Sequence, residues 1–144
     1  MTGVQTCALP ISASERDAYD WTPDASRRAR GFAVYAALRS LGKEGVTALI
    51  ERCCAHARRL AAGVGELPGA RILNEVALNQ VLVRFESDEQ TAAVGRRVRE
   101  GGEAWMGDTE WGGSRAIRLS VSGWATTTED IDRTVAAFAA AVAG

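Results

Sequence analysis

The residue that could do chemistry most directly is Arg118, in the segment RAIRLSVSGWATT. This segment alternates with a period of two, as a strand with one buried face does. Its core-facing positions are Ile117, Leu119 and Val121. The residues that share the other face with Arg118 are small: Ala116, Ser120 and Ser122. A single guanidinium with open space above it can bind a carboxylate through two parallel hydrogen bonds. The pattern therefore predicts a carboxylate site, with the alternative that Arg118 only covers the solvent side of a one-sided sheet.

Other reactive residue types do not form a recognisable catalytic or metal-binding set. His56 is the only histidine, and its place at the edge of a helical stripe favours a partly buried helix residue over a general base. Cys53 and Cys54 are adjacent, so they diverge by about 100° around a helix and are poorly placed to share a metal. The pairs Gly101-Gly102 and Gly112-Gly113 occur in no phosphate-binding pattern.

Composition limits the protein to one globular domain without an obvious polyanionic partner. Of 144 residues, 47% are hydrophobic and 24% are charged, which suits a folded core. The 17 basic and 18 acidic side chains nearly cancel, so we expect neither a nucleic-acid groove nor binding to an anionic membrane. The three cysteines form no disulfide framework, and no apolar run is long enough to span a bilayer. We therefore expect a reducing, cytoplasmic setting.

The chain is expected to have three parts. Residues 1–11, MTGVQTCALPI, show no helical or strand period and resemble the translation of a sequencing adapter, so we expect a non-native, disordered segment there. Residues 12–23 are polar and turn-prone and predict an arm. Residues 24–144 are expected to form the folded domain.

Within that domain the apolar periodicity predicts an α+β fold with the order αα-ββ-α-ββ-α. The first helix covers 24–41 and ends at Gly42, and the second runs to Gly63 and Gly65 with Val46, Leu49, Ile50, Cys53, Ala57, Leu60 and Val64 in its stripe. Ser87 with Gln90 caps a third helix that runs to about Glu100, and Thr126 with Glu129 caps the last one. The expected strands are 71–73, 79–85, 104–106 and 115–122, with a turn-rich stretch over 108–114.

Four segments, in order, resemble a known family. They are DASRRARGFAVYAALRSLGKEG, ALNQVLVRF, AWMG and RAIRLSVSGWATTTEDID. Together they are similar to the C-terminal part of the pyridoxal-phosphate-dependent (PLP-dependent) amino-acid decarboxylases related to aromatic amino-acid and glutamate decarboxylases (group II). The resemblance covers Ser12 to Gly144. It implies the small C-terminal domain of the aspartate-aminotransferase-type fold: a small antiparallel or mixed four-stranded sheet, covered on one face by helices and preceded by two long helices.

The resemblance also implies roles for two residues. Arg118 matches the arginine that contacts a substrate carboxylate, and Ser26 matches a position near the phosphate of PLP bound to the neighbouring subunit. The intact parent would then be a homodimeric lyase that removes carbon dioxide from a small amino acid, with PLP as its cofactor.

The same resemblance exposes what the chain lacks. The family holds PLP on a lysine and stacks a histidine on its ring, yet Lys43 is the only lysine and lies beside Glu44 outside the expected context. We therefore expect Lys43 to be a surface residue, and we expect the chain alone neither to decarboxylate nor to bind PLP tightly. Gly123 departs from the larger polar residue expected at its position.

Two other interpretations stay open: an aminotransferase of the same fold, and a free-standing α+β module that binds or senses a small carboxylate. A part of a larger lyase should carry an uncovered apolar surface on the helix of Phe32, Val34 and Tyr35, whereas a complete module should not. At least one of Trp105, Trp111 and Trp124 should then be exposed near Arg118.

Overall fold

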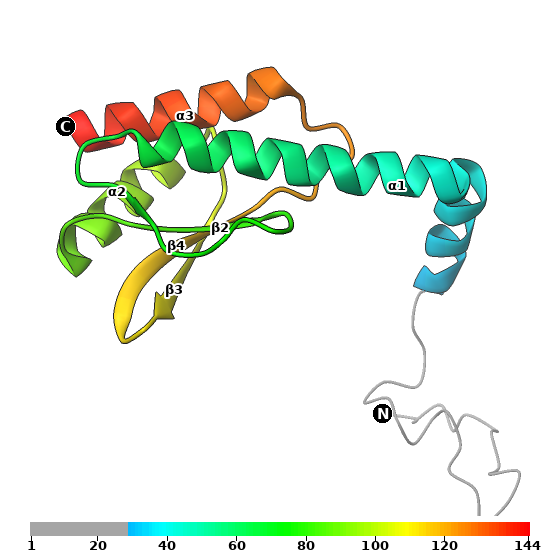
Figure 1. The fold of residues 1–144 in the computed structure, drawn as a ribbon, viewed down its shortest axis with the longest axis horizontal. Helices are drawn as coiled ribbons and strands as arrows, with labels where there is room; N and C mark the ends of the chain where they lie inside the picture. Colours follow the sequence, from blue (N-terminus) through cyan, green and yellow to red (C-terminus); the bar gives the residue numbers. More distant parts are fainter. Residues whose placement is uncertain (1–28) are drawn as a thin grey trace, which may run out of the picture. The chain divides into compact units, whose positions relative to one another are not determined.

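The computed structural model describes residues 29–144 (Figure 1). The predicted segments 1–11 and 12–23 and the predicted site residue Ser26 lie outside the described residues. The chain divides into two compact units, Met1–Leu41 and Gly42–Gly144. The described helices and strands that position Arg118 all belong to the second unit.

The two predicted N-terminal helices are one element, α1 (Arg30–Gly65), interrupted at Gly42. Gly42 has φ 63 and ψ −175, a left-handed conformation that glycine adopts without steric cost, and this confirms it as the residue where the first helix stops. In the first unit, Phe32, Val34 and Tyr35 are 80%, 59% and 63% exposed, as expected for an uncovered apolar surface.

The second part of α1 buries the predicted stripe with one exception. Ala57, Leu60 and Val64 are almost completely buried, and the helix ends at Gly65 as expected. Ile50 was predicted to belong to this stripe but is 53% exposed, so that prediction is wrong. Ile50 lies before Cys53 and Cys54, the first buried residues of the helix. The apolar period therefore begins earlier in the sequence than the part of the helix that packs into the core.

The sheet is open and fully antiparallel, with strand order β1-β2-β4-β3. This confirms the α+β class, the four strands and their order in the sequence. The strands are β1 (Arg71–Ile72), β2 (Gln80–Arg84), β3 (Gly107–Trp111) and β4 (Ser114–Ser120).

The third strand is displaced from its predicted position. Residues 104–106 were expected to form it, with a turn-rich stretch over 108–114, but β3 occupies 107–111 instead. The turn is confined to Gly112 and Gly113, whose φ values of 58 and 77 are those of a two-residue hairpin turn in which both central residues are left-handed. β3 therefore continues to residue 111, which is five residues beyond the predicted end of the strand at residue 106.

Both C-terminal helices begin at side-chain caps. α2 (Asp88–Glu100) has Ser87 as its N-cap, and the Ser87 hydroxyl accepts a hydrogen bond from the Gln90 amide at 3.1 Å, as predicted. α3 (Thr128–Ala143) is capped by Thr127 with Asp130 rather than by Thr126 with Glu129. The predicted cap is wrong by one residue. Three threonines precede Glu129 and Asp130, so a threonine followed three residues later by an acid occurs at two successive positions.

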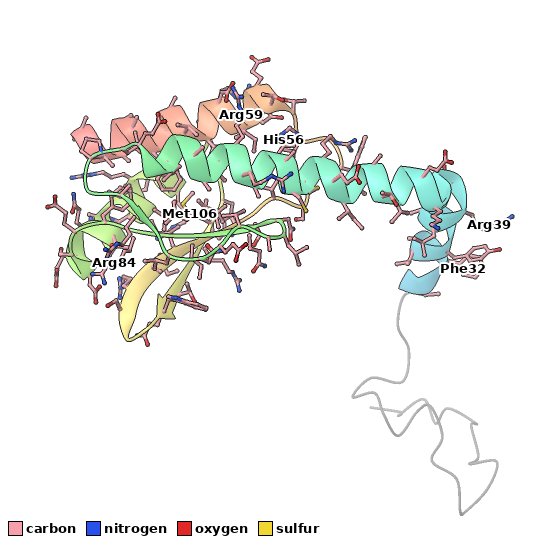
Figure 2. All side chains as sticks on the ribbon, viewed as in Figure 1. Phe32, Arg39, His56, Arg59, Arg84 and Met106 are labelled. Carbon is pink, nitrogen blue, oxygen red and sulfur yellow. The ribbon has the colours of Figure 1, made fainter. Side chains whose placement is uncertain are left out.

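One face of the sheet is covered by the second part of α1, by α2 and by α3. Figure 1 shows α3 beside the second part of α1, with the sheet beneath them. Inward side chains of β2 and β4 meet the apolar stripes of the helices in one core, which includes Leu60, Val64, Val81, Val83, Phe85, Val94, Val98, Met106, Ile117, Leu119, Ile131 and Phe138. Met106 is 3% exposed and lies between the sheet and α1 (Figure 2). None of the helices among residues 29–144 combines the length and the apolar character that a bilayer crossing requires.

A candidate carboxylate site on the open face of the sheet

Arg118 lies in the middle of β4, a central strand, and projects from the face that the helices leave uncovered. Its flanking residues Ile117 and Leu119 are 0% and 3% exposed in the core, whereas Arg118 is exposed. Its register partners are Leu82 in β2 and Gly107 in β3. The predicted orientation of Arg118 is therefore confirmed.

The guanidinium of Arg118 has no partner in the part of the chain that the structure describes. Within residues 29–144, Arg118 makes no hydrogen bond and no ion pair, whereas Arg59, Arg99 and Arg133 each pair with an aspartate. Its donors are therefore available to a ligand, and a planar guanidinium matches the two oxygens of a carboxylate.

The surroundings of Arg118 on this face are small and polar, with one correction. Ser120 and Ser122 are exposed, as predicted. Ala116 was expected to leave open space but is completely buried, because its single methyl group projects less from the sheet than larger side chains such as that of Thr109, its partner in β3. The open space around Arg118 therefore extends toward Ser120 and not toward Ala116.

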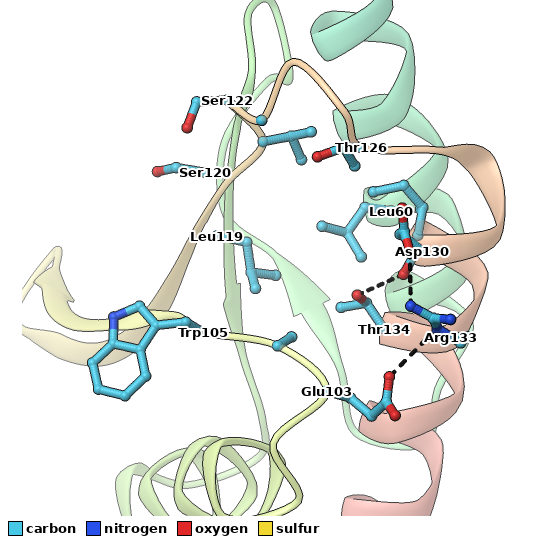
Figure 3. Close-up of a pocket in the computed structure, with 14 residues that line it drawn as sticks. Leu60, Glu103, Trp105, Leu119, Ser120, Ser122, Thr126, Asp130, Arg133 and Thr134 are labelled. Atoms are coloured by element: carbon cyan, nitrogen blue, oxygen red, sulfur yellow. Dashed lines mark hydrogen bonds and ion pairs between the residues drawn. The ribbon is translucent and has the colours of Figure 1, made fainter.

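A tryptophan shares this face. Figure 3 shows the side chains of Trp105, Ser120 and Ser122 on the side of β4 opposite to α3. Trp105 is 87% exposed and comes two residues before Gly107, the partner of Arg118. Since burial alternates through Trp105, Met106 and Gly107, Trp105 and Arg118 lie on the same face. This confirms that one of the three tryptophans is exposed near Arg118; Trp111 and Trp124 are exposed as well.

A hollow of about 280 Å³ lies beside this face but does not include Arg118. It opens between β4, residues 103–105 and α3, with Leu60, Leu119 and Ile131 among its walls (Figure 3). Its charged side chains are already paired, because Arg133 lies 2.7 Å from Asp130 and 3.5 Å from Glu103. The hollow is therefore not the carboxylate site that the sequence predicts.

The carboxylate of Asp130, at the start of α3, is held by its own helix cap. It accepts hydrogen bonds from the amide and hydroxyl of Thr127 at 2.8 and 2.7 Å. These hydrogen bonds, more than the nearby charges of Arg133 and His56, lower the pKa of the Asp130 carboxyl. Asp130 therefore supports the fold of α3.

The remaining reactive residues lie away from the open face. Lys43 is exposed immediately after Gly42, which confirms it as a surface residue. His56 is 8% exposed, and it projects from α1 near Arg59, which is bound to α3 (Figure 2). Its Nε2 atom has no hydrogen-bond partner among the described residues. Cys53 and Cys54 are buried free thiols, and in the described part of the chain no three His, Cys, Asp or Glu side chains could hold a metal.

Sequence reasoning missed Gly107 as part of the site. A Cβ added to Gly107 would lie 3.8 Å from Nη2 of Arg118, so the guanidinium lies over this glycine. The signal was present in AWMG, where tryptophan and glycine occupy alternate positions on either side of a buried methionine.

No family model matches the chain, and no curated protein matches its sequence. Solved structures do match. The chain is similar to Oryza sativa TDC, solved with PLP and tryptamine, at a TM-score of 0.76 and 17% identity over 88% of this chain and 29% of that one. It is similar to Catharanthus roseus tryptophan decarboxylase, solved with L-tryptophan, at a TM-score of 0.74 and 20% identity over 87% of this chain and 29% of that one.

A third similar structure is Rhodiola rosea 4-hydroxyphenylacetaldehyde synthase, with a TM-score of 0.71 and 21% identity over 93% of this chain and 31% of that one. At these identities the likeness establishes the fold, and it confirms the predicted fold of a small C-terminal decarboxylase domain. The chain spans less than a third of the length of these structures.

Proposed function

We propose that this chain is the C-terminal part of a PLP-dependent enzyme that decarboxylates an L-amino acid, and that Arg118 binds the carboxylate of the substrate. One observation carries the proposal: an exposed arginine with no partner among residues 29–144 projects from the helix-free face of a fold that also occurs in amino-acid decarboxylase structures. The intact parent is proposed to be a homodimer.

Arg118 would act by fixing the substrate in one orientation. The central strand fixes the backbone of Arg118, and a carboxylate bound by two hydrogen bonds loses rotational freedom before the reaction. Such positioning is worth several kcal/mol in favourable cases. The absence of a paired acid beside Arg118 within residues 29–144 favours this role, since an internal ion pair would compete with the substrate.

The described residues do not fit a complete PLP site. An imine with PLP needs a lysine amine in a shielded pocket, and Lys43 is exposed on α1. His56 is buried away from the open face of the sheet and cannot stack on a ring placed over Arg118. We therefore assign PLP binding to the part of the parent that this chain does not contain, and we expect the chain alone to be inactive. Ser26 near the cofactor phosphate stays a prediction.

The exposed apolar helix of the first unit supports a part of a larger enzyme over a free-standing module. Its side chains Phe32, Val34, Tyr35, Leu38 and Leu41 are between 45% and 80% exposed. Complete monomers seldom leave such a surface in water. The choice of decarboxylation over another reaction of the same fold rests on the resemblance of the sequence motifs, because a fold alone does not fix a reaction.

The test is to recover the gene from its genome and to express the complete protein that it encodes. We expect it to contain PLP and to release carbon dioxide from an L-amino acid, and Arg118→Ala should raise KM while PLP remains bound. Arg118→Lys is the matched variant that keeps the charge but loses the two-point contact. A complete protein that binds no PLP, or activity that is unchanged in Arg118→Ala, would contradict the proposal.

A further inference from the structure

The end of the Arg118 side chain lies on one side of its own strand. Arg118 faces Gly107 in β3 and Leu82 in β2, so its guanidinium could lie over either neighbour. Its Nη2 atom lies 3.8 Å from the place where a Cβ of Gly107 would be. On the other side, Leu82 carries a bulky side chain that is only partly buried. The guanidinium therefore lies toward β3.

Gly107 is an unusual residue for a strand, and its backbone does not require glycine. The glycines with a positive φ among the described residues are Gly42, Gly69, Gly102, Gly112 and Gly113, and Gly107 is not one of them. Glycine weakens a strand and often marks a place where another group approaches the backbone closely. Here the approaching group is the guanidinium of Arg118.

Trp105 lies on the same face as Arg118. It precedes Gly107 by two residues on the open face, and 87% of its side chain is exposed. Figure 3 places its indole on the side of β4 that carries Ser120 and Ser122. An anion bound to a guanidinium above Gly107 would therefore have the indole next to it, whereas on the β2 side it would meet Leu82.

We propose that Gly107 is a positioning residue that lets Arg118 lie across β3, so that the bound carboxylate sits above β3 with Trp105 as its side wall. This inference rests on the proposed function and adds the location of the carboxylate to it. We also infer that the indole of Trp105 contacts the apolar part of the ligand next to its carboxylate. A larger residue at 107 would occupy the space of the guanidinium and push it toward Leu82.

The experiment uses the purified chain, labelled with ¹⁵N, and the spin-labelled carboxylate 3-carboxy-PROXYL. The paramagnetic group broadens the NMR signals of nearby protons. We expect the strongest broadening at the Gly107 amide and the Trp105 indole N–H, with about threefold less at the Leu82 amide on the other side of Arg118. The broadening should be lost in Arg118→Ala and with the neutral analogue 3-hydroxymethyl-PROXYL.

Substitutions on β3 test Gly107 itself. Gly107→Val should reduce the broadening by about threefold or more, because one of the two guanidinium hydrogen bonds is lost when the side chain is displaced. Gly107→Ala should have a smaller effect, since its Cβ would only touch Nη2. Thr109→Val is the matched control, because Thr109 is the next outward residue of β3 and pairs with Ala116 instead of Arg118. Valine favours strands, so loss of folding is not expected.

The outcomes separate the two proposals. Broadening that depends on Arg118 but is strongest at Leu82 and Gln80 would overturn the location above β3 and leave the proposed function standing. Unchanged broadening in Gly107→Val would overturn the positioning role alone. Broadening that is the same in Arg118→Ala, or the same with the neutral analogue, would contradict carboxylate binding by Arg118 and with it both proposals.

Discussion

Arg59 of α1 donates two hydrogen bonds to the carboxylate of Asp132 of α3, at 2.7 and 2.9 Å, across 73 residues of sequence. This two-point contact joins the two helices that lie side by side over the sheet. Because the guanidinium stabilises the charged carboxylate, chiefly through the hydrogen bonds, the pKa of Asp132 is lowered and that of Arg59 is raised. About half of each side chain is exposed, so solvent weakens the contact.

Replacing Asp132 by asparagine is expected to cause a small loss of stability that disappears in acid. A carboxyl with a lowered pKa in the folded state stabilises the fold above its unfolded pKa of about 3.9, and this contribution is lost as the pH falls through the folded pKa. The free energies of unfolding of the two proteins, from urea titrations, should therefore differ at pH 6 and converge toward pH 3. A difference that stays constant or grows on acidification would show that the pair does not act in this way.

Removing the cap of α3 should have a larger effect that does not depend on Asp132. The Thr127 hydroxyl accepts a hydrogen bond from the Asp130 amide at 3.2 Å and donates one to its carboxylate. Thr127→Ala is expected to lower the free energy of unfolding by about 1 kcal/mol. Thr126→Ala is the control, since Thr126 is not the cap, and a larger loss in the control would place the helix start one residue earlier.

The order of helices and strands could be predicted from the sequence, because in most of them the apolar residues recur with a single period, 3.6 for a helix or two for a strand. Val81 and Val83 in β2, followed by Phe85, illustrate this. The exact edges of β3 and α3 could not be obtained in this way. The position of β3 depends on its pairing with β4, which overrides the turn propensity of 108–114. The start of α3 depends on which of three adjacent threonines accepts a hydrogen bond from a backbone amide of the helix.

The close approach of α1 to α3 offers a test of packing. A Cβ on Gly63 would lie 2.8 Å from Cγ2 of Val135, too near for two carbon atoms. Gly63→Ala should therefore lower stability by about 1–3 kcal/mol through overpacking. In the background of Val135→Ala the same change should instead raise stability by about 1 kcal/mol, because alanine favours the helix. Equal effects in both backgrounds, measured in a double-mutant cycle, would rule out this contact.

A buried hydroxyl links β2 to α2. Thr91 is completely buried; its oxygen accepts a hydrogen bond from the Phe85 amide at 3.0 Å and donates one to the Ser87 carbonyl at 2.7 Å. Thr91→Val keeps the shape but leaves the Phe85 amide without a partner, and it should cost about 1–3 kcal/mol. Thr91→Ser keeps the hydroxyl and should cost less. Thermal unfolding followed by circular dichroism would compare them, and a valine variant as stable as the wild type would contradict the assignment.

The sequence identified the cation of the candidate site but not its whole environment. Arg118 was found because alternation within one strand fixes which face a residue occupies. Gly107 begins a strand that was predicted three residues too early, and Trp105 precedes that strand by two residues, so their register with Arg118 could not be known. The burial of Ala116 likewise depends on neighbouring strands and not on its own segment.

The most direct measurement of carboxylate binding follows the side-chain Nε–H signals of the arginines while acetate is added to the ¹⁵N-labelled chain. Arg58 and Arg96 serve as controls in the same spectrum, because both are exposed and neither has a partner within residues 29–144. If Arg118 is a carboxylate site, its signal should move toward saturation at acetate concentrations where those of Arg58 and Arg96 change only slightly and linearly. Equal, linear changes at all three arginines would mean that Arg118 is an ordinary surface residue.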